Sequence, residues 1–508
     1  MSGSDLADRV GTILQVDPAE FRRRVEADAE IIREEIEAGT FDNPQAIVGL
    51  EYEFYAVDDE GALARLPRRL LEYVGFEKEL GLHNGEMSTT PDPLNRPGVV
   101  AQEAIVESRL EAARVPMDAE GVHLVSDGMW TVPPAGETTA EYLTDSVEQD
   151  GVRVATNMSE SARYHAMANT DVETGMAIDV PHATLTADTV MPESLITSIQ
   201  PHYQVPQAVD LPEYFRYAIR VAAPLLALGV NTPFVPPDLY DDGIDPERIL
   251  ADGWMEHRIA VFESVLNEPE GVSKVRFPAD LETVDDAIEA IATDEVIVPM
   301  PVEEAGRFDD SFAHFRRKHG TFWRWVRPVF DGASRSEANA RIEFRPLSAQ
   351  PTVRDSIAFL AMYAGLLERM RQHHHPLYYL DWREAKSNFY DVMRHGLDAE
   401  IAYVTVDDEK TTDKDEMYAD LFEEARAGLV SRGFTEDEAA EYLWPLRRRA
   451  RHRITPADWK RARVEENLEA GMDLETAVHE MQFEYMDRQR ETLLSGTFAD
   501  WVETGGDL

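Results

Sequence analysis

Cysteine is missing from this chain, and its absence removes several classes of protein at once. None of the 508 residues is a cysteine, so disulfides, thiolate metal sites and a cysteine nucleophile are excluded. Long apolar runs are scarce as well. The longest, over 221–230, contains Pro224 and is about half of the ~20 residues that cross a bilayer. The first residues show neither the basic start nor the apolar stretch of a secretory signal. We therefore expect a soluble, cytoplasmic protein without a membrane partner.

Basic residues, and lysine above all, are also in short supply. Asp and Glu number 97 against 49 Lys and Arg, only seven of them Lys, and the formal net charge is −48. Because nucleic-acid phosphates need a basic footprint, this balance excludes a nucleic-acid partner. An acid excess of this size fits a halophilic protein, since concentrated salt shortens the Debye length and screens the self-repulsion. An ordinary acidic cytosolic protein is the alternative explanation.

Hydrophobic residues make up 43% of the chain, which is enough for a large core. Hydrophobic periodicity predicts helices and strands in a mixed order. Helices are expected at 18–38, 97–114, 211–228 (with a possible kink at Pro224) and 353–372. Strands are expected at 46–57, 196–205 and 341–345. Weakly periodic residues 133–192 are expected to hold short elements, and the chain after about 380 is expected to be almost wholly helical.

No internal repeat or low-complexity linker divides the chain into independent halves. We therefore predict one mixed α/β body with helical ends. Its parts are a helical N-terminal segment 1–45, a catalytic body 46–400, and a helical C-terminal extension 401–508 that packs on the body. The sequence does not indicate an oligomeric state.

Three of the expected strands alternate polar and apolar residues, which places each polar set on one face of its strand. Each strand taken alone is also typical of an antiparallel strand with one solvated face. Within the second strand, Pro201 has no N–H and indicates an edge or a bulge. The polar sets are Glu51 and Glu53; Gln200, His202 and Gln204; and Arg341, Glu343 and Arg345.

Taken in order, these segments resemble the sequence blocks of the glutamate–cysteine ligase family, in its carboxylate–amine ligase branch. Gly49-Leu50-Glu51-Tyr52-Glu53 resembles the opening strand of that family, and 79–91 its next block, with two carboxylates seven residues apart before Thr-Pro. Residues 200–205 are similar to its histidine-bearing strand. The most specific stretch is 319–366, and 394–399 is similar to a late Gly-Leu-Asp-Ala block. The resemblance covers about 46–400, discontinuously.

The resemblance implies an α+β fold, in which a glutamine-synthetase-like antiparallel sheet curves into a half-barrel surrounded by helices, with a helical C-terminal region. It also implies an ATP-dependent carboxylate–amine ligase of the glutamate–cysteine ligase type, whose small-molecule partners are amino acids and ATP. Such an enzyme phosphorylates the γ-carboxylate of glutamate, and the amine of an amino acid then displaces the phosphate. Because clustered Glu side chains repel ATP, divalent cations must lie between them. Oxygen ligands favour Mg²⁺ or Mn²⁺ over zinc.

The resemblance assigns roles to individual residues. The metal-ligand candidates are Glu51, Glu53, Glu79, Glu86 and Glu343, with Asp127 as a further one. The catalytic candidates are Glu343 and Arg345, and the guanidinium of Arg345 is expected to contact ATP at the transferring phosphate. The substrate-binding candidates are His202, Arg327 for an α-carboxylate, and Arg258.

Two other functions remain open at this stage. One is a ligase on the same scaffold with a different acid or amine, and the other is a non-catalytic protein that binds a nucleotide or an amino acid. Departures from the family pattern at Pro201, Gln204 and 235–238 lie near the substrate residues, so the acceptor amine is less determined than the ATP step. Two further clusters have structural interpretations. Residues 373–375 are interpreted as a helix end beside Pro376, because consecutive residues of a helix point in different directions. The arginines of 447–453 are interpreted as one face of a helix that pairs with acidic neighbours.

Overall fold

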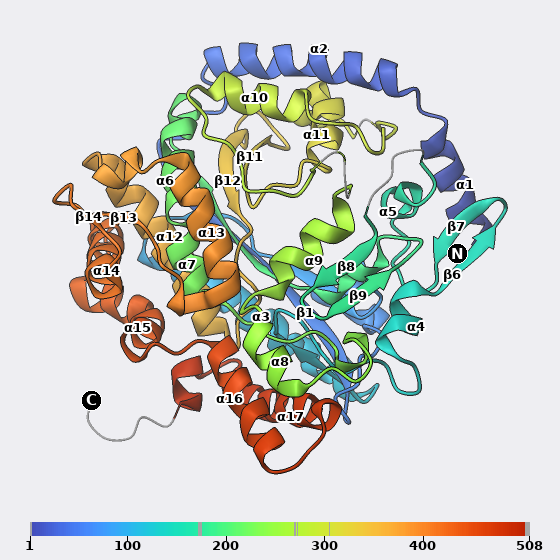
Figure 1. Cartoon of the computed structure of the whole chain (residues 1–508). Coiled ribbons are helices and arrows are strands. Elements are labelled where there is room, and N and C mark those ends of the chain that lie inside the picture. Colours follow the sequence, from blue (N-terminus) through green and yellow to red (C-terminus); the bar gives the residue numbers. More distant parts are fainter. Residues whose placement is uncertain (1–2, 171–174, 269–270, 272, 304, 503–508) are drawn as a thin grey trace.

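A curved antiparallel sheet occupies the centre of the molecule (Figure 1). The structure is a computed structural model that describes residues 3–170, 175–268, 271, 273–303 and 305–502. Residues 1–2 and 503–508, at the outer ends of the two expected terminal segments, lie outside the described residues. The strand order is β11-β12-β10-β1-β3-β2, and β4 and β5 also pair with β1. The strands are β1 (Ile47–Asp58), β2 (Glu77–Lys78), β3 (Asn84–Ser88), β4 (Asp92–Pro93), β5 (Val122–Val125), β10 (Ile199–Gln204), β11 (Val326–Asp331) and β12 (Asn339–Phe344).

One face of this sheet is apolar and is covered by helices. Tyr52, Tyr203 and Phe344, from three adjacent strands, are fully buried. Helices α3 (Arg96–Asp118), α6 (Leu211–Arg220) and α12 (Val353–Gln372) lie against this face. The ring of Phe344 stacks on Tyr363 of α12, with centroids 4.5 Å apart, and the Tyr203 hydroxyl donates to Glu368 of the same helix at 2.8 Å. The polar side chains of the alternating strands must therefore point to the opposite, inner face.

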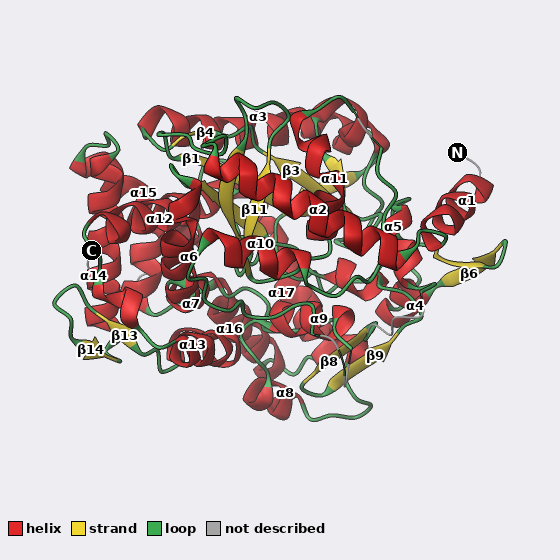
Figure 2. Cartoon of the chain, turned by 90° about the horizontal axis from the view of Figure 1, so that it is seen from above, coloured by secondary structure: helices red, strands yellow, loops and turns green. Residues whose placement is uncertain are grey.

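The remaining helices surround the sheet, and Figure 2 shows α2 crossing above α10. Of the C-terminal helices, those at 414–431 and 436–452 lie against α12 and against each other, and those at 456–469 and 474–492 pack on one another. Their bounds are α1 (Gly3–Leu14), α2 (Pro18–Glu37), α4 (Thr139–Thr144), α5 (Ala162–Met167), α7 (Ala222–Gly229), α8 (Pro246–Asp252), α9 (His257–Leu266), α10 (Val284–Ala292), α11 (Ala313–His319), α13 (Trp382–His395), α14 (Lys414–Ser431), α15 (Glu436–His452), α16 (Pro456–Glu469) and α17 (Leu474–Thr492). Small two-stranded pairs are β6 (Ser146–Gln149) with β7 (Val152–Ala155), β8 (Ala177–Val180) with β9 (Ala183–Thr186), and β13 (Tyr403–Val404) with β14 (Lys410–Thr411).

Most expected elements are present, and the differences have local causes. The helix expected at 211–228 is interrupted at Val221 rather than at Pro224. Pro224 has no N–H to donate to the carbonyl of Arg220, so the helix breaks one turn before the proline. The expectation that Pro201 marks an edge is wrong, because β10 lies between β1 and β12. The ladder of β10 with β12 comprises only 202–204, so the missing N–H falls just outside it.

The two clusters with structural interpretations have the expected surroundings. Helix α12 ends at Gln372 with His373 as its C-cap, and the side chain of His375 caps the turn that follows. Arg449 is buried against Asp355 at 2.8 Å, and Arg453 pairs with Asp415 at 2.6 Å. Among the described residues, no helix combines the length and the apolar character that crossing a bilayer would require.

Candidate active site

The inner face of the sheet brings together polar side chains from five adjacent strands. Residues directly opposite one another in an antiparallel ladder have Cβ atoms about 4.5–5.5 Å apart. The strand register therefore forces side chains that are distant in the sequence into contact. The relevant pairs are Glu53 with Glu86, Glu51 with Gln200, His202 with Glu343, and Arg327 with Glu343.

A cavity of about 480 Å³ opens on this face and collects most of the candidates from the sequence. Its wall also contains Gln200, Tyr164 and Trp323. Glu343 lies directly behind the two arginines of the wall and is only 2% exposed. The candidates that line the cavity are Glu51, Glu53, Glu79, Glu86, Arg327 and Arg345.

The carboxylates of this cavity crowd one another. Burial, reinforced by the nearby charge of Glu79, raises the pKa of Glu53 to about 7. The Glu53 carboxylate accepts hydrogen bonds from the Ser198 N–H at 2.7 Å and from the Gln200 side chain at 3.0 Å. Burial and the charges of Glu51 and Glu79 raise the pKa of Glu86 well above its usual range. Like charges held this close in a buried site are stable only if they are protonated or matched by cations.

A further carboxylate, Glu193, lines the same cavity and was missed by the sequence analysis. It lies on a short 3₁₀ helix, Met191–Leu195. Burial, followed by the charges of Glu79 and Glu53, raises the pKa of Glu193 to about 8. The surrounding sequence has no clear periodicity, and one Glu among 97 acidic residues carries no signal of its own. Its position beside the other carboxylates of the cavity is evident only in the three-dimensional structure.

Two arginines hold Glu343 in its ionised form. The Arg327 guanidinium donates to Glu343 Oε1 at 2.8 and 3.0 Å, and Arg345 Nη1 donates to the same oxygen at 2.5 Å. Burial alone would raise the pKa of Glu343, but these two cations hold it well below its usual range. Arg345 Nη1 also donates to Gln200 at 2.7 Å, and its buried Nε has no hydrogen-bond partner among the described residues. Arg345 therefore has an N–H donor left for a ligand.

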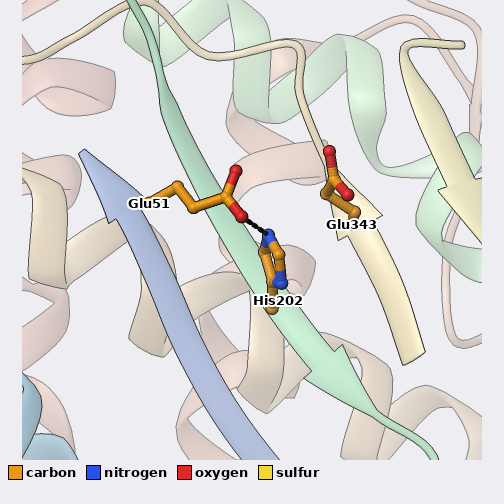
Figure 3. A group of neighbouring side chains, drawn as sticks. All are labelled: Glu51, His202 and Glu343. Atoms are coloured by element: carbon orange, nitrogen blue, oxygen red, sulfur yellow. Dashed lines mark ion pairs between the residues drawn. The ribbon is translucent and has the colours of Figure 1, made fainter. Parts of the chain in front are cut away.

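Figure 3 shows that Glu51, His202 and Glu343 come from three neighbouring strands and face one another. One ligand atom from each lies within 4.8 Å of the others, a spacing that could hold a metal ion. His202 Nε2 is 3.4 Å from Glu51 Oε1 and is a buried atom without a hydrogen bond in the described structure. Arg341 Nε donates to the other ring nitrogen, Nδ1, at 3.3 Å.

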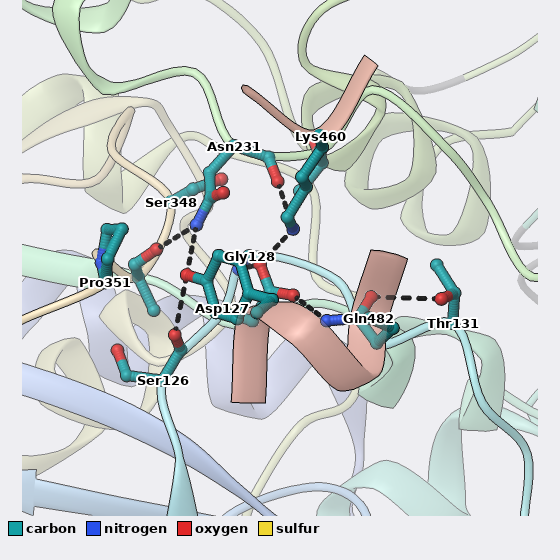
Figure 4. Close-up of polar contacts among 12 residues, drawn as sticks. Ser126, Asp127, Gly128, Thr131, Asn231, Ser348, Pro351, Lys460 and Gln482 are labelled. Carbon is teal, nitrogen blue, oxygen red and sulfur yellow. Dashed lines mark hydrogen bonds and ion pairs between the residues drawn. The ribbon is translucent and has the colours of Figure 1, made fainter. Parts of the chain in front are cut away.

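The prediction that Asp127 binds a metal has no support in its surroundings. Asp127 is fully buried away from the main cavity, in the polar network of Figure 4. Its carboxylate is paired with Lys460 at 2.5 Å and accepts from the Gln482 amide at 2.7 Å and from the Gly128 N–H at 2.7 Å. Both oxygens of Asp127 are thus engaged within the fold, Oδ1 by Lys460 and Gly128 and Oδ2 by Gln482, and nothing presents this carboxylate to a cation in the main cavity.

Arg258 is likewise placed behind the cavity wall rather than in it. Its guanidinium is 4% exposed and faces Glu256 at 3.4 Å. Nη2 donates to the carbonyl oxygens of Arg345 at 2.9 Å and Pro346 at 2.5 Å. The structure therefore gives no support for direct substrate contact by Arg258, because Nε and Nη2 are engaged within the fold. Arg258 instead fixes the backbone that carries Arg345.

Chemically, the main cavity combines several carboxylates with a guanidinium that has a free donor. Carboxylate oxygens are the ligands that Mg²⁺ and Mn²⁺ prefer, and such ions commonly bridge carboxylates to phosphate oxygens. An arginine beside them can stabilise the charge of a phosphoryl group. Two smaller cavities, of about 300 and 240 Å³, adjoin the first and share Glu51 with it. The three cavities therefore meet at Glu51.

Known proteins resemble this chain in sequence and in fold. The model of glutamate-cysteine ligase family 2 (GCS2) matches residues 47–491. A search of curated proteins finds no significant match. Among solved structures, the chain is similar to the glutamate–cysteine ligase of Francisella tularensis in complex with AMP, with 14% identity, a TM-score of 0.52, and coverage of 89% of this chain and 91% of that one.

Two more solved structures show weaker similarity. The bifunctional glutathione synthetase of Pasteurella multocida is 15% identical, with a TM-score of 0.47 and coverage of 92% of this chain and 56% of that one. The ligase PafA, in complex with the prokaryotic ubiquitin-like protein Pup, is 12% identical, with a TM-score of 0.41 and coverage of 87% and 72%. At such identities the similarity concerns the fold alone. The expected half-barrel fold, with its surrounding helices, is confirmed.

Proposed function

Because the chain belongs to glutamate-cysteine ligase family 2, we propose that it joins the γ-carboxylate of glutamate to the amine of an amino acid such as cysteine. The family makes the protein an ATP-dependent enzyme that forms a carbon–nitrogen bond. The observation that carries the finer proposal is the convergence of Glu51, Glu53, Glu79 and Glu86 on the cavity that also contains Arg345.

The side chains of the cavity fit divalent cations. Burial and neighbouring carboxylates raise the pKa values of Glu53 and Glu86, and a bound cation would offset both effects. The unpartnered Nε2 of His202 lies within ligand distance of Glu51 and Glu343. The residues that would hold Mg²⁺ or Mn²⁺ are Glu51, Glu53, Glu79, Glu86, Glu343 and His202. Bound there, such ions would screen the phosphate charge of ATP and orient its terminal phosphate. His202 thus changes from a predicted substrate contact to a proposed cation ligand. Ligation through Nε2 requires the ring proton on Nδ1, so the long Arg341 contact to Nδ1 must open when the cation binds.

The protein's own groups have distinct tasks in the proposed reaction. The γ-carboxylate oxygen of glutamate attacks the terminal phosphorus of ATP, which releases ADP and leaves γ-glutamyl phosphate. Arg345 stabilises the charge on the transferring phosphoryl group through its free N–H. Glu343, held between Arg327 and Arg345, fixes the orientation of that guanidinium. The amine then attacks the acyl carbon, inorganic phosphate leaves, and the nitrogen loses a proton.

The enclosing walls serve the second half of the reaction. An acyl phosphate hydrolyses in water, so the intermediate must be shielded until the amine arrives. Tyr164, Phe262 and Trp323 supply apolar surface around the carboxylates of the main cavity. Their rings limit the water that reaches the acyl phosphate.

Phosphate release from ATP tests this function directly. We expect release by the purified chain only when glutamate, an amino-acid amine and Mg²⁺ are all present, and only background release when any one is omitted. Screening the common amino acids as acid and as amine identifies the two substrates. Turnover with another pair would assign a different ligase on the same scaffold, whereas binding of ATP without turnover in every mixture would contradict the proposal.

A further inference from the structure

Helix α15 turns one face outward, away from the catalytic cavity. Figure 1 shows this helix at the edge of the molecule beside α14, and its other side packs on α12 and α14. Residues three and four apart along a helix share one face. We call the outward set the outer face of α15, and all of its members are exposed except Arg448, which is half-buried. They are Asp437, Glu441, Trp444, Arg447, Arg448 and Arg451.

Three arginines of the outer face have no acidic partner. Arg449 and Arg453 of the same cluster are ion-paired, but Arg447, Arg448 and Arg451 form no ion pair within the described part of the chain. The prediction of acidic neighbours is thus confirmed for only two of the five arginines. Unpaired cations gathered on one face are unexpected in a chain with 97 acidic and 49 basic residues.

Trp444 lies at the middle of the outer face. Its side chain is 42% exposed, and no other tryptophan among the described residues is as exposed. The guanidinium of Arg448 lies over its ring, 5.6 Å from the ring centroid, and the buried Nε of that arginine has no hydrogen-bond partner in the described structure. Tryptophan and arginine are enriched among the residues that contribute most to protein–protein binding. The exposed pair therefore indicates a surface that another protein covers.

The acidic residues of the outer face lie toward the other end of the helix. Asp437 has no ion pair among the described residues, and Glu441, with its side chain 69% exposed, has only a contact with Arg354 at 3.4 Å. The helix macrodipole favours acids in the first turn and cations in the last turn. It does not account for Glu441, Trp444 and Arg447, because these residues occupy the middle turns of α15.

The order of charges along the outer face is symmetric about Trp444. Asp437 and Arg451 each lie seven residues from Trp444, and Glu441 and Arg447 each lie three residues from it. A second α15, antiparallel to the first and related to it by a two-fold axis at Trp444, would therefore place an arginine opposite each acid. Every contact across a two-fold interface occurs twice. Both pairs would thus form on each side of the two tryptophans.

We propose that the outer face of α15 binds the same face of a second copy of this chain, with the two helices antiparallel and Trp444 at the two-fold axis. Asp437 then faces the partner's Arg451, and Glu441 faces the partner's Arg447. A different acidic protein, or a nucleic acid, would match the arginines but would be repelled by the acids of the same face. A second copy matches both, so charge complementarity selects it as the occupant.

The net charge of −48 determines the conditions for the test. Two chains with this charge repel each other at low ionic strength. In about 1 M KCl the Debye length is about 3 Å, so the long-range repulsion is screened, whereas charges in direct contact are screened less. The association is therefore measured at this salt concentration.

Sedimentation velocity of the full chain over about a 100-fold range of concentration tests the inference, because a dimer responds to protomer concentration. We expect a monomer–dimer equilibrium for the wild type. Arg447→Glu with Arg451→Glu makes the outer face predominantly acidic, and Asp437→Arg with Glu441→Arg makes it basic. Each double variant should weaken the dimer by at least about 100-fold, because like charges then face each other.

A matched control separates the effect of this face from that of total charge. Arg22→Glu with Arg383→Glu makes the same change of charge at exposed positions on α2 and α13, and should dimerise like the wild type. A mixture of the acidic-face and basic-face variants should recover a dimer that neither variant forms alone. Circular dichroism verifies that each variant is folded.

Cross-linking locates the axis independently of the charge variants. The chain has no cysteine, so Trp444→Cys introduces a single thiol that the two-fold axis brings close to its copy. Oxidation should cross-link Trp444→Cys much more than Val115→Cys, which places a thiol at a position 76% exposed on α3. A wild type that stays monomeric, folded charge variants that dimerise like the wild type, a folded mixture that stays monomeric, or equal cross-linking at the two positions would overturn the inference.

Discussion

Arg345 is the side chain on which the proposed chemistry depends most. It is tied to Glu343 and Gln200, and its buried Nε lacks a partner in the described structure. Removing a single donor that stabilises transition-state charge costs about 10²–10³ in rate. We predict that Arg345→Gln lowers kcat for phosphate release by about 10²–10³-fold in a chain that stays folded, because Arg327 still pairs with Glu343. Arg383→Gln, at an exposed position on α13, should retain full activity, and so would Arg345→Gln if the assignment is incorrect.

Buried histidines make a separate contribution to stability. His257 Nδ1 donates to the Thr232 carbonyl at 2.8 Å, and Nε2 accepts from the Trp254 N–H at 3.4 Å, so only the neutral ring is satisfied. Burial lowers the pKa of His257 to about 4, against about 6.5 in the unfolded chain. Between these values the unfolded state binds the additional proton, and stability is lost as the pH falls from about 6.5 toward 4.

The difference between the folded and unfolded pKa values of His257 predicts that the free energy of unfolding changes measurably with pH. We expect the His257 contribution to fall by roughly 3 kcal/mol between pH 7 and pH 4. His257→Gln should therefore show a shallower decline of the unfolding midpoint over this range than the wild type. His374→Gln removes an exposed histidine, 77% accessible, and should follow the wild-type curve. Identical slopes for His257→Gln and the wild type would mean that the ring is already charged in the folded protein.

At the residue level, sequence reasoning found the side chains whose spacing reflects a strand. Glu51, Glu53 and Glu343 alternate with apolar neighbours, and the sheet register then brings them together. It failed where the deciding partner lies far along the chain. Asp127 is neutralised by Lys460, more than 300 residues away, and Arg258 is turned onto the carbonyl oxygen of Arg345. No local pattern reveals either contact.

Among the elements, helices α16 and α17 reach into the polar core behind the active site (Figure 4). Lys460 of α16 donates to Asp127 and, at 2.9 Å, to the Asn231 carbonyl. The Asn231 N–H donates to Glu256, which faces Arg258. We propose that the C-terminal extension 401–508 braces the catalytic body 46–400 through these contacts. The family model extends across this boundary to residue 491, so Lys460 and Gln482 belong to the region that matches the family.

Breaking the buried Lys460–Asp127 pair tests whether these contacts stabilise the catalytic body. Lys460→Met leaves Asp127 charged in an apolar core and should lower the free energy of unfolding by about 3–5 kcal/mol, measured by urea denaturation. Adding Asp127→Asn removes the uncompensated charge and should restore most of the loss. Lys410→Met breaks an exposed pair with Glu384 and should cost no more than about 1 kcal/mol. If Lys460→Met and Lys410→Met lower the free energy of unfolding equally, the buried Lys460–Asp127 pair does not stabilise the fold more than an exposed pair does.

Element boundaries were predictable where the hydrophobic period was strong. The helix expected at 353–372 has exactly those ends in the structure because Thr352 caps its first turn. Irregular segments were less accessible to sequence reasoning. The turn that carries Glu193 is five residues long, too short to generate a periodic pattern. The missing Pro224 N–H could be assigned from the sequence to the Arg220 carbonyl, but whether the helix would kink or be interrupted there could not.

For the whole molecule, charge is the dominant property. A net charge of −48 produces self-repulsion in the folded state that added salt screens. We predict that raising KCl from about 0.1 M to above 1 M, where the Debye length falls from roughly 10 to 3 Å, raises the thermal unfolding midpoint and the rate of phosphate release. Matched sucrose solutions provide the control for non-ionic stabilisation. A midpoint that stays constant or falls with KCl would favour an ordinary acidic protein over a salt-adapted one.

The central claim is that the carboxylates of the inner face hold cations that tether ATP. Anomalous diffraction from crystals grown with Mn²⁺ and a non-hydrolysable ATP analogue measures this most directly. The account predicts Mn²⁺ peaks in contact with Glu51, Glu53 and Glu86, with the terminal phosphate of the analogue on the same ions and beside Arg345. Nucleotide bound elsewhere, or a cavity without Mn²⁺ at saturating concentration, would contradict it.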